Sequence, residues 1–113
     1  MQNQNKYNME IDFKEDYLQE LYRKGKATDK KHRYQPSIIR KYIRVIDLMI
    51  DQPDVLALKK YNSLCYEQLK GDKAGLSSVR VNDQYRIEFE EKIIGNQLVA
   101  TICYITELSN HYK

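Results

Sequence analysis

The fold of this chain is decided by residues 78–89, which read Ser-Val-Arg-Val-Asn-Asp-Gln-Tyr-Arg-Ile-Glu-Phe. Apolar and polar residues alternate on both sides of a polar segment, a pattern typical of two half-buried antiparallel strands. The five apolar or aromatic side chains reach one face only if the loop has an odd number of residues, most simply Asn82-Asp83-Gln84. That register predicts that Arg80 lies directly opposite Arg86 on the other face of the hairpin.

The two facing arginines have two interpretations. Like charges directly opposite each other destabilise a sheet by about 0.2–1 kcal/mol, so a sequence that keeps them favours a site that holds an anion. Alternatively, Glu88 lies diagonal to Arg80 and two residues from Arg86, and it would neutralise both in an ordinary ion-paired surface. The hairpin alone leaves both interpretations open.

Outward from the hairpin, segments with strand spacing and segments with helical spacing follow one another. Residues 9–13 alternate like a strand, and residues 14–24 carry apolar side chains at helical spacing before Gly25. Pro36 and Ser37 open a second amphipathic helix, which Pro53 ends. Shorter elements are expected at 54–60 (a helical turn), 66–70 (a strand), and 71–75 and 92–96 (turns).

The last strand is predicted at residues 98–105, which are almost entirely apolar, so we expect it to be central and covered on both faces. The order of elements then predicts an α+β fold. An N-terminal strand and two helices pack on an antiparallel sheet of three to four strands, and a short C-terminal tail follows.

Length and composition fit one domain covering residues 1–113, of which residues 1–8 form a polar arm that could remain disordered. No apolar run approaches the roughly 20 residues of a membrane-spanning helix, and no secretory signal is visible. A cytoplasmic protein without a membrane partner is therefore predicted. We interpret Cys65 and Cys103 as small buried hydrophobes. Because no clustered His/Cys spacing exists, we predict no metal and no cofactor.

Positive charge is concentrated in residues 23–44, which hold nine Lys/Arg and one acidic residue, for a charge of +8. The rest of the chain has ten basic and fifteen acidic residues, or −5, which gives the total of +3. Such a block attracts nucleic acid or an acidic protein partner. A solvated surface that only serves solubility is the alternative.

The Leu-Lys-Gly-Asp at 69–72, the hairpin at 78–89 and the Ser-Asn-His-Tyr at 109–112 resemble the signature of HigB-type toxins in the RelE/ParE superfamily. The resemblance is close over residues 69–89 and, through the element order, extends to most of the chain. It implies a RelE-like fold and a toxin of a type II toxin–antitoxin system. Such a toxin is a ribosome-dependent mRNA endonuclease (mRNA interferase) that inhibits translation, and a HigA-type antitoxin with a helix-turn-helix domain neutralises it.

The resemblance also implies metal-independent chemistry and assigns roles to residues. Lys70 matches the turn lysine, Arg86 the strand arginine and His111 the terminal histidine. Two positions depart from the pattern. Glu67 stands where the best-matched toxins have a histidine, and a carboxylate could serve as the base there. Ser109 stands where an acidic residue often precedes the terminal Tyr-His. These departures leave open that the activity is altered, weaker or lost.

Contacts to RNA or the ribosome are predicted for a set of basic residues and one terminal tyrosine: Lys30, Lys31, Arg33, Arg40, Lys41, Arg44, Arg80 and Tyr112. Tyrosines near the hairpin and the chain end could stack on a base or supply a proton: Tyr66, Tyr85, Tyr104 and Tyr112. Two other functions stay open on the same fold. One is a ParE-like toxin acting on DNA gyrase, and the other is a catalytically inactive module that only binds an antitoxin or a nucleic acid.

Overall fold

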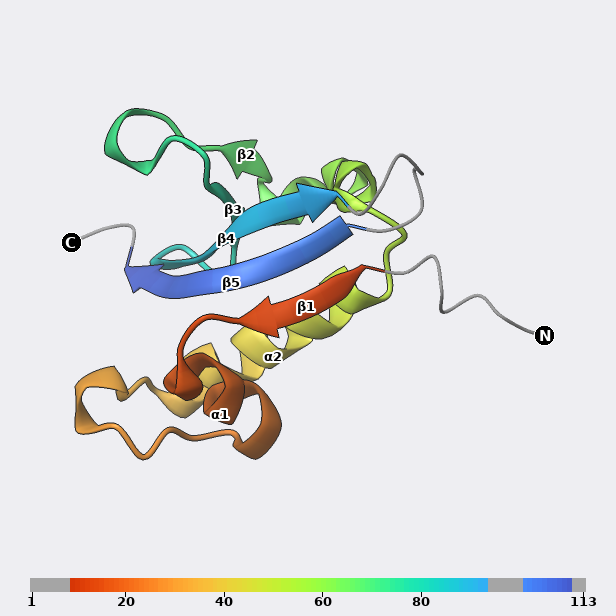
Figure 1. Ribbon diagram of the computed structural model, residues 1–113. Helices are drawn as coiled ribbons and strands as arrows, with labels where there is room; N and C mark the ends of the chain where they lie inside the picture. Colours follow the sequence, from red (N-terminus) through yellow and green to blue (C-terminus); the bar gives the residue numbers. More distant parts are fainter. Residues whose placement is uncertain (1–8, 94–100, 111–113) are drawn as a thin grey trace.

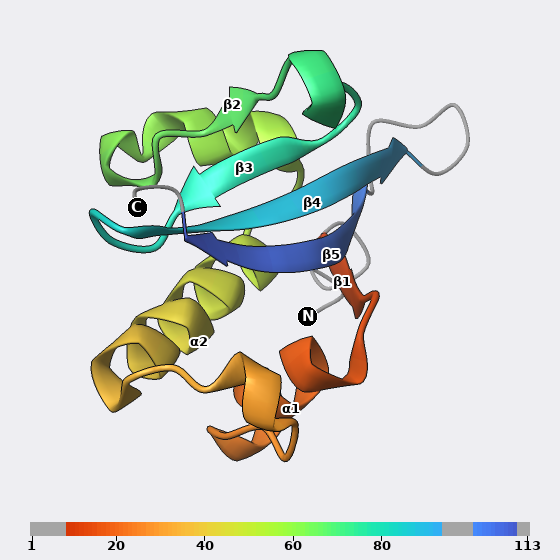
Figure 2. The ribbon, with the colours of Figure 1, turned by 90° about the vertical axis from the view of Figure 1, so that its left-hand side faces the viewer.

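A five-stranded mixed sheet runs through the molecule, and the two main helices pack on one of its faces (Figures 1 and 2). The structure is a computed structural model that describes residues 9–93 and 101–110. The strands, given in their order across the sheet, are β1 (Glu10–Phe13), β5 (Thr101–Asn110), β4 (Tyr85–Ile93), β3 (Ser77–Arg80) and β2 (Glu67–Gln68). The predicted α+β fold is therefore confirmed.

The sheet is larger than predicted because the N-terminal strand joins it. β1 pairs with β5 in parallel, whereas all other neighbours are antiparallel. An edge strand from the start of the chain and a strand from its end thus lie side by side (Figure 1). The sheet has five strands instead of three or four, and it is mixed instead of antiparallel. A sequence alternation shows that residues 10–13 form a strand, but it does not show which strand they join.

The helices lie close to their predicted positions. α1 spans Asp16–Lys24 and ends at Gly25, whose φ of 75° is a left-handed conformation that glycine adopts without strain. α2 spans Pro36–Ile50, with proline in its first turn. Tyr42 is fully buried between the helices, and its hydroxyl donates a hydrogen bond of 2.8 Å to the Leu18 carbonyl. No helix in the described part of the chain is long and apolar enough to cross a membrane.

Short 3₁₀ helices connect these elements. They are η2 (Lys30–His32), η3 (Val55–Lys60), η4 (Asn62–Leu64) and η5 (Gly71–Lys73). η3 covers the helical turn predicted at 54–60, and the core includes its buried Val55 and Leu58. η5 lies in the connection between β2 and β3, which the sequence indicated as a turn.

β5 continues five residues beyond its predicted end at Ile105, because a β-bulge interrupts the alternation there. Phe89 pairs with Ile105, but Glu88 pairs with Glu107, so Thr106 is the extra residue. Ile105 and Leu108 are three residues apart and yet both buried. A strand without a bulge would point them to opposite faces. The bulge thus explains why the sequence pattern predicts a tail after Ile105 although the strand continues. Residues 98–100 of the predicted strand lie outside the described residues.

The prediction for Cys65 is wrong, because its side chain is exposed. Cys65 follows η4 and adopts a left-handed backbone conformation with φ of 46°. The chain therefore turns at this residue, and the preceding Leu64 fills the core instead. The side chain of Cys103 is not among those described.

Candidate active site

The face of the sheet opposite α1 and α2 carries a row of polar residues from four adjacent strands. Glu67 of β2 pairs with Ser78 of β3, Ser78 with Glu88 of β4, and Glu88 with Glu107 of β5. Residues paired directly across a sheet project to the same face. The alternate residues Val79, Ile87 and Phe89 are fully buried in the core, so this row belongs to the other face, called here the open face.

Arg80 and Arg86 lie next to this row on the open face, and the structure pairs them directly, as the hairpin register predicts. The loop is Asn82-Asp83-Gln84, because the Val81 N–H donates to the Tyr85 carbonyl over 2.8 Å. Asn82 fixes the loop, since its side-chain oxygen accepts from the N–H groups of Gln84 (2.9 Å) and Tyr85 (2.8 Å).

The two arginines have different partners. Arg86 is half-buried and donates a 3.3 Å hydrogen bond to the Ser78 hydroxyl. Arg80 forms an ion pair with Asp83 in the loop. The interpretation in which Glu88 neutralises both arginines is wrong, because the Glu88 carboxylate binds Lys73 instead. β5 brings Ser109 directly opposite Arg86 on its other side.

The turn that carries Lys70 is fastened to the open face by an ion pair. Lys73 Nζ lies 2.7 Å from Glu88 Oε2, and the Glu88 side chain is only 7% exposed. This hydrogen bond raises the pKa of Lys73 above its ordinary value. Lys70 directly precedes η5, and its carbonyl accepts from the Lys73 N–H over 3.3 Å. Its exposed side chain makes no hydrogen bond or ion pair with the described residues, so it is available to a ligand.

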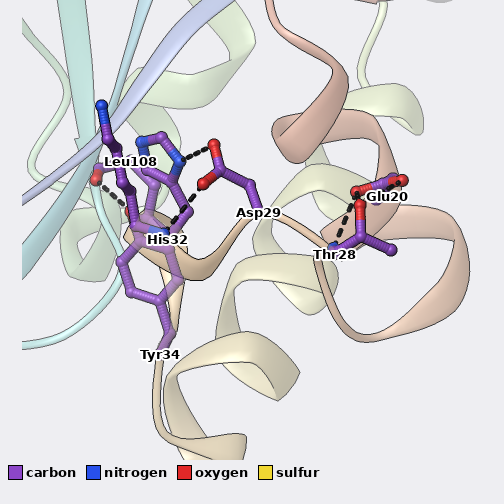
Figure 3. A network of polar contacts seen from close by, with 7 residues as sticks. Glu20, Thr28, Asp29, His32, Tyr34 and Leu108 are labelled. Carbon is purple, nitrogen blue, oxygen red and sulfur yellow. Dashed lines mark hydrogen bonds and ion pairs between the residues drawn. The ribbon is translucent and has the colours of Figure 1, made fainter.

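The loop between α1 and α2 carries Lys30, Lys31 and Arg33, all exposed, and it is anchored to the strand that reaches Arg86. The Tyr34 hydroxyl donates a 3.1 Å hydrogen bond to the Leu108 carbonyl, one residue before Ser109 (Figure 3). Burial raises the pKa of Tyr34, whose ring also meets Tyr85 edge to face. The anchored loop therefore lies at the same end of the sheet as the arginine pair.

A second set of contacts holds the shape of this loop. The His32 ring stacks on Tyr17 with centroids 3.6 Å apart. Its Nδ1 lies 2.9 Å from Asp29, and Figure 3 shows His32 and Asp29 side by side. Asp29 also accepts from the Lys31 N–H, and these two contacts lower the pKa of Asp29. Thr28 donates its backbone N–H to Glu20 of α1 over 3.1 Å. The predicted basic residues of the loop thus project from a fixed scaffold.

The remaining basic residues, Arg40, Lys41 and Arg44, are all exposed on α2. Of these, Lys41 lines a groove of about 260 Å³ together with Arg80 of the arginine pair. The structure therefore brings basic residues from the loop, from α2 and from the hairpin to one end of the molecule.

Several predicted residues do not join this site or cannot be placed in it. Tyr66 and Tyr85 lie on the helix-covered side, where Tyr66 donates to Glu91 and Tyr85 meets Tyr34. His111 and Tyr112 lie outside the described residues, as does the side chain of Tyr104. In residues 9–93 and 101–110, no group of three or more His, Cys, Asp or Glu side chains is arranged to hold a metal ion.

Comparison with known proteins places these features in a family. The family model for the RelE-like toxin of the type II toxin–antitoxin system HigB matches residues 11–104. The chain belongs to the HigB-like toxin family. Toxin HigB-1 of Vibrio cholerae serotype O1 is 33% identical to this toxin over 86 residues, which cover 73% of this chain and 83% of that one. The toxin is therefore part of a type II toxin–antitoxin system, and its family implies a cognate antitoxin.

The fold of this HigB-like toxin also matches a solved structure. The YoeB/ParE toxin from Agrobacterium tumefaciens superposes with a TM-score of 0.52 over 92% of this chain and 100% of that chain, at 18% identity. The RelE-like fold is thus shared beyond recognisable sequence similarity. The family match includes Glu67, Lys70 and Arg86 but ends at Tyr104, before His111.

Sequence reasoning missed several residues of the site of this toxin. Lys73 was interpreted only as part of a turn, and its contact with Glu88 depends on how that turn folds over the sheet. Glu107 was assigned to a tail, because the bulge at Thr106 hides the strand. Ser109 was singled out as a departure from the family pattern, but its position opposite Arg86 was not predicted. Asp83 was interpreted only as a loop residue. Its position three residues after Arg80, across a tight loop, was the one signal that could have indicated an ion pair.

Proposed function

We propose that this toxin is a metal-independent, ribosome-dependent mRNA endonuclease that inhibits translation, and that a HigA-type antitoxin with a helix-turn-helix domain neutralises it. The observation that carries the proposal is the direct pairing of Arg80 with Arg86 on the open face. Guanidinium groups bind phosphate through geometrically matched, charge-assisted hydrogen bonds. Two of them opposite each other, with the exposed Lys41 lining a groove together with Arg80, favour a phosphodiester as the ligand.

The reaction needs three functions besides binding. A base takes the proton of an RNA 2′-hydroxyl as its oxygen attacks the neighbouring phosphorus, and cations stabilise the resulting phosphorane. An acid then protonates the 5′-oxygen as the P–O5′ bond breaks. Glu67 is the proposed base, since it lies two residues along the strands from the arginine pair on the same face. Arg86 and Lys70 stabilise charge, and His111 supplies the proton.

The ribosome would hold the mRNA against this site through the basic residues at the same end of the molecule. Lys30, Lys31 and Arg33 on the anchored loop and the exposed cations of α2 contact phosphates of ribosomal RNA rather than bases. Such binding weakens steeply with salt. Replacing Lys30, Lys31 and Arg33 together by Gln should therefore weaken ribosome binding while leaving the fold intact.

The test is induction of the toxin alone in cells, with cleavage of mRNA on purified ribosomes as the biochemical measurement. We expect growth arrest and an early fall in methionine incorporation for the wild type. Arg86→Ala should lose about 10²–10³-fold in cleavage rate, as expected when one donor to a charged transition state is removed. Glu67→Gln should also lose cleavage. Lys60→Ala and Asp12→Asn, exposed on η3 and β1, are the controls of matched charge.

Two other results would redirect the proposal. Equal arrest by the wild type, Arg86→Ala and Glu67→Gln would mean that toxicity needs binding but not RNA cleavage. A fall in thymidine incorporation before methionine incorporation would instead indicate a gyrase-directed toxin on the same fold.

A further inference from the structure

A groove lies between α2 and the β3–β4 hairpin, and Arg80 is part of its lining. It has a volume of about 260 Å³, and its lining includes Lys41 and Val45 of α2, Leu64 of η4, and Arg80 and Asp83 of the hairpin. Its walls are thus partly apolar and partly cationic. A cleft of this size accommodates one sugar-phosphate unit, but not an oligonucleotide or a folded partner.

The groove holds a cation whose present partner is easily displaced. Arg80 forms its ion pair with Asp83, and the Asp83 side chain is 93% exposed. Exposed ion pairs contribute little to stability, because solvent screens them and two side chains must be held in one geometry. A phosphate offers a guanidinium two oxygens in a matched arrangement and gives a stronger hydrogen-bonded pair. The intramolecular carboxylate therefore competes poorly with a bound phosphate.

The other cation of the groove makes no hydrogen bond or ion pair with the described residues. Lys41 is exposed on α2, in the same helix face as Arg40 and Arg44. Once Asp83 leaves Arg80, the side chains of Arg80 and Lys41 are both available in the groove to bind one phosphate. Arg86 is held separately by Ser78, on the other side of Arg80. An RNA strand bound at Arg86 could therefore extend toward Arg80 and Lys41.

We propose that this groove is a second phosphate subsite for RNA, in which Lys41 and Arg80 bind a backbone phosphate beside the one held at Arg86, and that Asp83 is a counter-ion which the RNA displaces. The proposal rests on the proposed function for the identity of the ligand as RNA. It assigns Asp83 an inhibitory role, because removing its charge frees Arg80 before the ligand arrives.

The test uses the whole toxin and a trinucleotide whose 2′-hydroxyls are methylated, so that it cannot be cleaved. Binding is followed through the arginine Nε–Hε signals in NMR spectra at low salt, with the trinucleotide raised to millimolar concentration. We expect the Arg80 signal to shift. Asp83→Asn should tighten binding about two- to fivefold, the range that corresponds to loss of an exposed ion pair. Asp12→Asn on β1 is the control for net charge and should have a much smaller effect.

Two variants locate the effect in the groove. Lys41→Gln should weaken binding and reduce the dependence on salt by about one phosphate contact. In an Arg80→Gln background, Asp83→Asn should no longer tighten binding, because the guanidinium that pairs with Asp83 is absent. All four side chains are at least partly exposed, and the unchanged dispersion of the remaining amide signals verifies that each variant is folded.

Three results would overturn the subsite. The first is an Arg80 signal that the trinucleotide leaves unmoved, with equal affinities for Asp83→Asn and Asp12→Asn. The second is inorganic phosphate binding as tightly as the trinucleotide, which would mean a general anion site without RNA recognition. The third is a shift caused only by a hexaglutamate peptide, which would assign the groove to an acidic protein partner.

Cleavage of ribosome-bound mRNA by the same preparations separates this proposal from the proposed function. Trinucleotide binding at Arg80 without any cleavage would refute the endonuclease but leave the subsite standing. Cleavage that is normal in Lys41→Gln and Asp83→Asn, with no response of the Arg80 signal, would refute the subsite and leave the endonuclease intact.

Discussion

The ion pair between Lys73 and Glu88 allows a quantitative prediction, because its two partners differ so much in burial. The Glu88 side chain is 7% exposed and lies 2.7 Å from the Lys73 ammonium, whose own side chain is 46% exposed. Lys73→Met removes the charge and the donor while keeping most of the side-chain volume. The Glu88 carboxylate is then left nearly buried, with Glu107 paired directly across from it.

The expected cost follows from that geometry. A hydrogen bond to a charged group contributes about 1.5–3 kcal/mol to the free energy of unfolding. This whole contribution is lost when the buried, charged acceptor is left without a partner. Because Lys73 is nearly half exposed, water screens the pair, so we take the lower end, about 1.5 kcal/mol. For a domain of this length, that corresponds to a fall in Tm of about 6 °C. Glu88→Gln on top of Lys73→Met should recover part of the loss, since the buried charge is gone.

Urea denaturation of the four members of this double-mutant cycle measures the coupling, and Lys60→Met is the control for loss of an exposed lysine. The raised pKa of Lys73 sets the pH dependence. Its charge stabilises the fold fully below the ordinary lysine pKa of 10.5, and this contribution is lost as the pH rises through the higher value of the folded state. Wild type and Lys73→Met should therefore converge in stability at strongly alkaline pH. A loss below about 0.5 kcal/mol at neutral pH would refute the reasoning, because it would place Glu88 in water.

Three further perturbations have defined outcomes. Tyr34→Phe removes the hydrogen bond to the Leu108 carbonyl, which should lower the free energy of unfolding by about 1 kcal/mol. Because this bond anchors the basic loop, we expect ribosome binding to weaken by more than this loss of stability explains. The hydrogen bond from Tyr22 to Asp47 raises the pKa of Tyr22 to about 12, so its stabilisation is complete below pH 10 and lost toward pH 12, and Tyr22→Phe should abolish that part of the alkaline transition. Deleting Thr106 removes the bulge and turns Leu108 out of the core, which should cost at least about 3 kcal/mol in urea denaturation, whereas Thr106→Ala should cost about 1 kcal/mol.

The parts of the fold that sequence alone predicted are those with short-range physical causes. The hairpin register followed from the period-two alternation and an odd loop, and Arg80 does pair with Arg86. The end of α1 followed from Gly25, which alone of the nearby residues takes a left-handed conformation without strain. In both cases the deciding residues lie within a few positions of one another.

The parts that failed depend on neighbours that are distant in sequence. β1 pairs with β5 across about 90 residues, and no local feature of residues 10–13 indicates which strand they pair with. The Tyr34 contact with Leu108 joins positions 74 residues apart, and the Lys73 contact with Glu88 joins positions 15 apart. For the candidate site, the arginine pair was predicted and the residues that hold it in place were not. Contacts between residues so far apart in sequence form only when the strands come together in the sheet.

The bulge at Thr106 links the fold to the proposed chemistry. Upstream of it, β5 buries Ile105 in the core, and downstream it buries Leu108, so the strand keeps an apolar face although its sequence loses the period of two. The same extra residue sets the register of the last residues of β5, and Ser109 then lies opposite Arg86 rather than opposite Tyr85. A strand without the bulge would turn Ser109 toward the helices and place Leu108 on the open face. One inserted residue therefore determines which side chains of the C-terminal strand share a face with the arginine pair.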